Sequence, residues 1–396
     1  MPVARPTYAA IFARFLRFGL LAWGGPVAQI AMIKRELVEE EEWLTPERFN
    51  RLLAVYQVLP GPEAHELCVH LGMMKRGRIG GILAGLGFML PGLLLILGIA
   101  WLYQRLDLGQ PLVASIFLGV QIGVIALIVR AVHRIGDHVL GSILLWAVGI
   151  ASALASWLGV SFWIVLPVAG LFHASAAAGR HVLAAAIAAF GLALAAWTTG
   201  PDGPGVPAAT GLVQATTVGA AALFLSGLKA GLLTFGGAYT AIPFVRNDAV
   251  AHGWVSQGQF LDSLALSGVI PAPLIIFATF VGYLAGGLAG ALAITAGIFL
   301  PAFGFALLFY DRLEQVIEDA RLHRLLEGVA AGVVGLIAVT AVQLGLGVAR
   351  SVPSLLLGAA IFAAALVLLY RWKSRLNVLA VILGSAVLGL GFGAGA

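Results

Sequence analysis

Long apolar runs follow one another along almost the whole chain, and short polar stretches separate them. A helix of roughly 20 apolar residues is long enough to cross the hydrocarbon core of a bilayer. The runs predict thirteen membrane segments, at residues 8–33, 48–74, 79–103, 111–134, 138–158, 160–178, 181–199, 214–245, 260–284, 288–310, 323–347, 353–370 and 375–395. We therefore expect an all-α polytopic membrane protein.

Two of these runs contain helix-breaking residues near their centres. Leu59-Pro60-Gly61-Pro62 interrupts the first, and Ile270-Pro271-Ala272-Pro273 interrupts the second. Proline removes a backbone donor and clashes with the preceding turn, so it ends a helix, but it is well suited to the first position of a new one. The sequence therefore predicts broken helices. Their free backbone groups are tolerated at membrane depth only where they face protein or a watery cavity.

The segments at 8–33 and 48–74 allow two interpretations. Each either crosses the membrane or turns back at its central break as a re-entrant hairpin. If both turn back, the orientation of every later segment is unchanged. If only 48–74 does, the basic run Lys75-Arg76-Gly77-Arg78 lies outside, which the preference for basic residues in the cytoplasm disfavours.

The chain also contains an internal repeat. Phe18–Gly25 aligns with Ala230–Gly237 at an offset of 212 residues. Glycine, proline, tryptophan and charged positions then match in order, among them Arg17 with Lys229, Lys34 with Arg246, Glu36 with Asp248, Trp43 with Trp254, Pro60 with Pro271, Pro62 with Pro273 and Pro91 with Pro301. So many ordered matches indicate a duplicated unit of about six segments.

Seven segments precede the second copy, and because seven is odd, the second copy enters the membrane the other way up. Inverted-topology repeats whose broken helices meet near the midplane are typical of secondary transporters. We assign residues 1–199 to the first repeat with a linking span, 200–213 to a Gly/Pro-rich linker, and 214–396 to the second, inverted repeat.

Composition and charge narrow the class further. Hydrophobic residues make up 61% of the 396 residues and charged residues 10%, whereas soluble domains carry about 25% charged residues. The net charge of +5 does not indicate nucleic-acid binding, because the basic residues lie in short loops between apolar runs. The single cysteine, Cys68, excludes a disulfide within the chain.

The basic residues also predict an orientation. With the N-terminus in the cytoplasm and thirteen crossings, 16 Lys and Arg residues lie on the cytoplasmic side and 6 on the outer side. Basic residues are enriched in cytoplasmic loops. We therefore expect a cytoplasmic N-terminus and an external C-terminus.

Several of these motifs together resemble one family. They are the Trp23-Gly24-Gly25-Pro26 stretch, Trp43, the run LPGPEAHELCVHLG from Leu59 and the run FGGAYTAIPFVRND from Phe235. The chain resembles the chromate transporter (chromate ion transporter, CHR) family of the long-chain, two-domain type, most clearly over 10–105 and 222–315. The resemblance implies efflux of chromate from a bacterial or archaeal cytoplasm, chromate resistance and a multi-pass protein of the cytoplasmic (inner) membrane.

Chromate is a tetrahedral dianion with the shape and charge of sulfate. A helix N-terminus supplies the N–H donors and positive potential that such an anion needs, so we expect the helix starts at the breaks to bind it. The candidate substrate-binding residues at the breaks are Gly24, Gly25, Pro60, Gly61, Pro62, Glu63, Gly236, Gly237, Pro271 and Pro273. The alternative is that these are kinks used only for packing. The second copy departs from the first, with Ala238, Ala272 and Leu274 in place of Pro26, Gly61 and Glu63.

Two cations complete the candidate site. Arg17 and Lys229 stand at equivalent positions beside apolar segments, where a cation either serves function or extends to the lipid surface. We expect Lys229 to be functional, and for Arg17 both interpretations stay open. Lys34, Glu36, Arg246 and Asp248 are interpreted either as vestibule charges or as helix-end salt bridges.

Other chemistry is poorly supported. The run His65-Glu66-Leu67-Cys68-Val69-His70 lacks a second histidine four residues after the first, as a zinc helix requires. We expect no metal, no cofactor, no P-loop and no enzymatic activity. The expected partners are chromate, with sulfate as an alternative, and the lipid bilayer; a homodimer is compatible with the sequence.

Three functions remain in consideration: chromate export, import or exchange of sulfate or another oxyanion, and a membrane-embedded enzyme or non-transporting subunit. The inverted repeat favours transport. A dianion leaving an inside-negative cell gains roughly 4.6 kcal/mol at 100 mV, so export needs no co-ion. Carboxylates that could carry protons inward are scarce, and Glu63 either gates the site or stabilises the start of its own helix.

Overall fold

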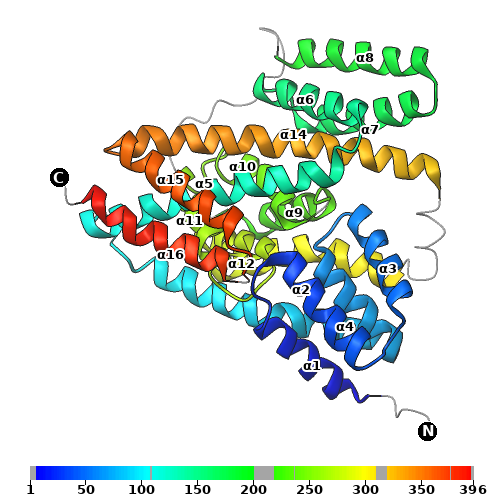
Figure 1. Cartoon of the computed structure of the whole chain (residues 1–396), viewed down its shortest axis with the longest axis horizontal. Coiled ribbons are helices and arrows are strands. Elements are labelled where there is room, and N and C mark those ends of the chain that lie inside the picture. Colours follow the sequence, from blue (N-terminus) through cyan, green and yellow to red (C-terminus); the bar gives the residue numbers. More distant parts are fainter. Residues whose placement is uncertain are drawn as a thin grey trace. The chain divides into compact units, whose positions relative to one another are not determined.

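A computed structural model describes residues 6–107, 109–199, 218–235, 237–308, 319–374 and 376–393, and the elements within them are helices (Figure 1). The predicted linker at 200–213 and Gly236 lie outside these residues. Five described stretches are long and apolar enough to cross a membrane: α4 (Glu63–Tyr103), α5 (Pro111–Val139), α8 (His181–Thr199), Leu274–Leu308, and α14 (Ala320–Ser351). Shorter apolar helices accompany them. The chain is therefore an α-helical multi-pass membrane protein, although the count of thirteen crossings is not confirmed.

The chain forms two compact units, which do not follow the boundary between the two copies. Unit 1 comprises residues 1–127, 212–310 and 345–396, and unit 2 comprises residues 128–211 and 311–344. Unit 1 contains the breaks of both copies. The repeat boundaries therefore stay a prediction, and the fold is described below one unit at a time.

In unit 1, the segment at 8–33 turns back on itself. It forms α1 (Tyr8–Leu20), α2 (Gly25–Lys34) and a π-helical turn, η1 (Arg35–Glu40). The guanidinium of Arg17 lies 3.3 Å from a carboxylate oxygen of Glu36, and Arg14 pairs with Glu41. Residues 19 apart would be about 28 Å apart in a continuous helix. The segment therefore folds back on itself, as the re-entrant alternative requires.

The segment at 48–74 turns back in the same way. It consists of α3 (Pro46–Val58) and the first part of α4. The hydroxyl of Tyr56 lies 2.7 Å from Nδ1 of His70, although 14 residues of continuous helix would hold the two about 21 Å apart. Both early segments are hairpins, which is the case that leaves the orientation of later segments unchanged. Figure 1 shows α1, α2 and α3 gathered around α4.

Helix α4 contains a second reversal. Arg76 (φ −141°, ψ 27°) and Gly77 (φ 64°, ψ −163°) leave the helical region. A Cβ atom on Gly72 would meet Ala84 and the carbonyl of Gly80, so residues 78–103 run back beside residues 63–75. The positive φ at this reversal favours glycine, because a side chain there would crowd the backbone.

The second copy repeats this architecture. It contains α9 (Ala220–Leu232), η2 (Ala238–Ala241), α10 (Ile242–Ala249), α11 (Gln257–Gly268), η3 (Leu274–Ile276) and α12 (Phe277–Leu308). Lys229 pairs with Asp248, as Arg17 pairs with Glu36. Helix α12 reverses at Gly286 (φ −145°, ψ 21°) and Gly287 (φ 62°, ψ −156°), with almost the same angles as α4.

Helix packing is also repeated, through glycines that touch backbone. A Cβ on Gly87 would lie 2.8 Å from the carbonyl oxygen of Phe12 and 3.0 Å from the amide nitrogen of Leu16. The aligned Gly297 faces the same groups of Phe224 and Leu228. Small residues allow helix backbones to approach closely where lipid provides no hydrophobic driving force. The sequence repeat is therefore a repeat of contacts.

The remaining helices exchange partners between the copies. In unit 1, Gly119 of α5 lies against Ser385 and Gly389 of α16 (Asn377–Gly389), which also contacts α15 (Leu355–Arg371). In unit 2, Gly328 of α14 lies against Ala169 and Gly170 of α7 (Phe162–Ala177). Unit 2 also holds α6 (Ile143–Trp157) and α8, and α8 packs against α7. A first-copy helix thus packs on the second copy, and the reverse.

We predict that Gly87→Leu destabilises the fold. Its new side chain would meet the backbone of α1, which cannot yield as a flexible side chain would, and overpacking of this kind costs about 1–3 kcal/mol. The matched control is Gly98→Leu on the same helix, where a Cβ atom has nothing within 4 Å. Thermal unfolding of the purified proteins in detergent measures the difference, and equal stability of the two variants would contradict this packing.

Candidate functional site

Four interruptions of helices define the candidate site. We call them break 1 (residues 21–24), break 2 (59–62), break 3 (233–235 and 237) and break 4 (269–273); each follows one helical arm of a hairpin and precedes the other. Gly24, Gly25 and Gly237 have positive φ values. The predicted residues at Pro60, Gly61 and Pro62 and those at Pro271 and Pro273 are buried. Breaks 2 and 4 and the described residues of break 3 are largely buried in unit 1, whereas Leu21 and Gly24 of break 1 are exposed.

Break 2 is hydrogen-bonded to break 3 of the other copy. The backbone N–H of Gly61 donates to the carbonyl of Thr234 at 2.8 Å, and Pro60 forms an isolated antiparallel bridge with Phe235. Gly61 has φ 150°, in the region that favours glycine. Two interrupted helices from residues more than 170 positions apart thus satisfy part of each other's backbone.

Break 1 is joined to break 4 by a single side chain, Gln29 of α2. Its Nε2 donates to the carbonyl of Ala22 at 3.0 Å and to the carbonyl of Ala272 at 3.2 Å. The side chain is 1% exposed, so its amide replaces water for two carbonyls that have left a helix. Sequence reasoning missed Gln29; a lone amide within an apolar run was the available signal.

The helix starts at the breaks differ between the copies. Pro62 before α4 and Gly24 before α2 provide no side-chain cap, so neither N-cap side chain covers the first N–H groups of its helix. After Gly237 and Pro273 the chain begins as 3₁₀ turns of 4 and 3 residues. The sequence predicted helix starts at the breaks of both copies, with the second copy departing from the first at Ala238, Ala272 and Leu274.

The two predicted cations lie one turn before breaks 1 and 3. The N–H of Leu21 donates to the carbonyl of Arg17 at 3.1 Å, and that of Leu233 to the carbonyl of Lys229 at 3.0 Å. Each cation is paired with an acid of the returning arm, Glu36 or Asp248. The Arg17 side chain is 58% exposed, whereas that of Lys229 is 16% exposed.

These pairs revise the arrangement of the predicted vestibule. Sequence reasoning grouped Glu36 with Lys34 and Asp248 with Arg246, whereas the structure pairs the two acids with the cations of the preceding arms. Lys34 and Arg246 are half-buried on α2 and α10. Whether these charges line an ion path stays a prediction.

Two acidic residues outside the predicted set are buried within unit 1. Asp262 of α11 accepts hydrogen bonds from the hydroxyl of Tyr103 at 2.6 Å and from Nε2 of Gln121 at 2.9 Å, which joins the two copies. Glu66 of α4 is 0% exposed. A Cβ atom on Gly61 would lie 2.5 Å from its Oε1, so its carboxyl group lies at break 2. Glu63 is buried beside it at the start of the helix.

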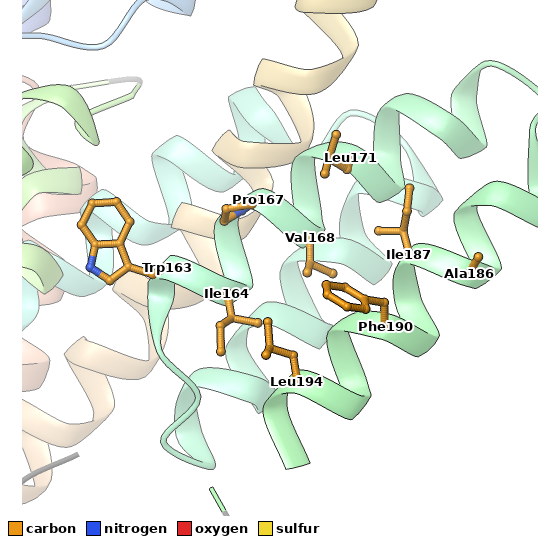
Figure 2. Close-up of a pocket in the computed structure, with 9 residues that line it drawn as sticks. All are labelled: Trp163, Ile164, Pro167, Val168, Leu171, Ala186, Ile187, Phe190 and Leu194. Carbon is orange, nitrogen blue, oxygen red and sulfur yellow. The ribbon is translucent and has the colours of Figure 1, made fainter. Parts of the chain in front are cut away.

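Other sites in the described residues have different chemistry. These residues contain no group of three metal-ligating side chains, and the ring of His65 lies among those of Phe88, Phe299 and Phe303. A groove of about 330 Å³ runs between α7 and α8 in unit 2 (Figure 2). Its nine lining residues are apolar, with Val168, Phe190 and Leu194 among them. Such a surface suits an acyl chain better than a dianion, which needs polar donors.

Comparison with known proteins identifies relatives over nearly the full length. The chain is 59% identical over 390 residues to a chromate transport protein of Pseudomonas aeruginosa, which covers 97% of this chain and 92% of the relative. It is 29% identical to a chromate transport protein of Cupriavidus metallidurans, over 97% of this chain and 94% of the relative. An uncharacterized transporter of Methanocaldococcus jannaschii is 27% identical over the same shares. No solved structure matches the chain.

The family comparison agrees with the duplicated pattern of breaks. The model of the chromate transporter family matches residues 9–174 and again residues 221–390. The curated relatives are transport proteins, which agrees with the expectation of a transporter rather than an enzyme. With both copies matched and a relative at 59% identity, the chain belongs to the chromate transporter family.

Proposed function

We propose that this protein is a secondary transporter that exports chromate from a prokaryotic cytoplasm and thereby confers chromate resistance. The observation that carries the proposal is the pairing of breaks from the two copies, through Gly61 with Thr234 and through Gln29 with Ala272. That pairing accompanies one uncapped α-helix start, that of α4, in the buried interior of unit 1. The proposed substrate is taken from relatives that are named as chromate transport proteins.

The arms of the hairpins are too short to cross a bilayer. Helices α1, α3 and α9 each have 13 residues, or about 20 Å, against a hydrocarbon core of about 30 Å. Hairpins that enter from the surface therefore place their breaks near the midplane. Secondary transporters commonly bind substrate at this depth, between broken helices.

An inverted relation between the copies is supported by the direction of their helices. Gly81 of α4 lies against Leu307 of α12, and Gly85 lies against Phe303. These pairs run in opposite directions, so the body of α12 is antiparallel to the aligned body of α4. In a membrane, this relation lets the same movement open the site first to one side and then to the other.

The hairpins also increase the difference in the number of basic residues between the two sides of the membrane. Folding back brings Lys34, Arg35, Arg48 and Arg51 to the side of the N-terminus, while Arg246 moves to the opposite side. The count with thirteen crossings had placed the first four of these residues on the outer side. The larger excess of basic residues on the N-terminal side supports a cytoplasmic N-terminus and an external C-terminus in the cytoplasmic membrane.

The electrostatics of the breaks suit an anion that must also leave. Arg17 and Lys229 are neutralised by Glu36 and Asp248, so the attraction comes chiefly from helix dipoles and N–H donors. Sulfate has the same shape and charge, and exchange of oxyanions is the main alternative. Export of a dianion is downhill by roughly 4.6 kcal/mol at 100 mV inside negative, whereas import needs more than two protons per ion.

We expect the purified protein in proteoliposomes to move chromate at a rate that rises with the imposed potential. A potential negative on the chromate-loaded side should accelerate exit, because each charge is worth about 2.3 kcal/mol per 100 mV. Gly61→Leu should abolish flux, because Gly61 has a positive φ and a side chain at this position would collide with Glu66. Gly98→Leu should retain flux. Flux no greater than in empty liposomes would refute the proposed function.

We expect cysteine labelling to report the hairpins. In a Cys68→Ala background, Glu39→Cys should react only from the cytoplasmic side, because the first hairpin returns its exposed end to that side, and Gly205→Cys should react only from outside. Reaction of position 39 from outside would mean that the first segment crosses. Reaction of position 205 from the cytoplasm alone would refute the inverted orientation.

A further inference from the structure

Glu66 is a buried carboxyl group with no hydrogen-bond partner among the described residues. It lies in the first turn of the helix that begins at Glu63, it is 0% exposed, and both of its carboxyl oxygens are unpaired. Buried polar side chains almost always have a partner in the protein or in bound water. Its unused hydrogen-bonding capacity therefore points to a ligand.

The side chain is directed at break 2. Side chains of a helix tilt toward its N-terminus, and Oε1 of Glu66 lies against the backbone of Gly61. The first N–H groups of the same helix begin here, and Pro62 provides them with no side-chain cap. Two independent features, an uncapped helix start and an unpaired acid, therefore meet at one place.

The surroundings of Glu66 determine whether its carboxyl group is neutral or ionised. An ionised carboxylate that is buried without partners costs far more free energy than the neutral acid. The charged group that acts on Glu66 within its own helix is another acid, Glu63. The cations one turn before breaks 1 and 3, Arg17 and Lys229, are each paired with an acid, Glu36 or Asp248. A neutral carboxylic acid carries one O–H donor, and that donor is available to an anion.

We propose that Glu66, as a neutral carboxylic acid, donates its O–H to an oxygen of the bound oxyanion and makes the site prefer chromate to sulfate. This inference rests on the proposed function. No covalent bond changes, and the proton stays on Glu66 throughout the cycle. The charge moved is therefore that of the anion alone.

The basis of the preference is acceptor strength. Chromate and sulfate share shape and charge, but hydrogen chromate releases its proton near neutral pH, whereas hydrogen sulfate is a strong acid. Chromate oxygens are therefore much better hydrogen-bond acceptors. The acidic O–H of a carboxylic acid exploits that difference more than a backbone N–H does. The second copy has Phe277 at the aligned position, so the discrimination is made once per chain.

The test compares wild type, Glu66→Gln, Glu66→Ala and Glu39→Gln in proteoliposomes, with chromate and sulfate flux measured across a range of pH. Glu39 is an exposed acid on η1, so Glu39→Gln controls for the loss of a carboxylate. Ratios to wild type at each pH cancel the change in protonation of chromate itself. A separate Glu63→Gln variant shows whether that neighbouring acid sets the pH dependence.

We expect wild-type chromate flux to fall as pH rises and Glu66 loses its proton, because the donor then becomes a repelling carboxylate. Glu66→Gln keeps an N–H donor at all pH values, so it should transport without that fall, and its chromate-to-sulfate preference should drop about tenfold. Glu66→Ala should lose chromate flux by roughly 10- to 100-fold. Glu39→Gln should match wild type.

Other outcomes overturn the inference. A wild-type preference for chromate over sulfate in Glu66→Ala would overturn it. An active Glu66→Gln whose chromate flux still falls with pH as in wild type would also overturn it. Loss of the pH dependence in Glu63→Gln alone would assign it to Glu63 instead. If wild type moves no chromate, the proposed function fails; if wild type transports but the Glu66 variants behave like it, only this inference fails.

A measurement on the wild-type protein tests the proposal even if the Glu66 variants do not fold. Infrared difference spectra should show the C=O band of a protonated carboxylic acid shifting when chromate is added, with a smaller shift for sulfate. The same band should persist in Glu63→Gln. No shift of a protonated carboxyl band on chromate binding would refute the proposal without any Glu66 variant.

Discussion

Unit 1 depends on the need to satisfy backbone groups where helices are interrupted inside an apolar protein. An unpaired peptide group in such surroundings costs several kcal/mol. Part of that cost is offset across the repeat: the N–H of Gly61 is bonded to Thr234 of the other copy, and Gln29 serves carbonyls at Ala22 and Ala272. Each copy thus completes the backbone of the other. Neither copy alone provides all the hydrogen bonds that the backbone at its breaks makes.

The positions of the breaks could be predicted from the sequence because glycine and proline act on the backbone locally. Whether the arms cross or turn back could not, since both arrangements present the same apolar pattern. The answer depends on contacts such as Arg17 with Glu36 and Tyr56 with His70, whose partners no local signal identifies. The duplication itself was readable, and it is repeated down to the angles at Gly77 and Gly287.

The side chains of the site were less predictable than its backbone. Gln29 and Asp262 matter through partners on the other copy, and one sequence offers no way to see those partners. Glu66 was visible beside break 2, but only the structure shows that its carboxyl group is unpaired. The copies have also diverged at the same place, with Gly61 and Glu66 opposite Ala272 and Phe277. A symmetric framework therefore carries an asymmetric set of donors.

The exchange of helices between the copies has a consequence for biosynthesis. The small-residue face of α5 at Gly119 is covered by Ser385 and Gly389, which follow it in the chain by more than 260 residues. Until those later residues are synthesised, this face of a newly inserted helix must rest against lipid or against a membrane chaperone. Assembly of unit 1 therefore depends on segments made late relative to α5, and a nascent chain that stalls before them leaves a packing surface of α5 exposed in the bilayer.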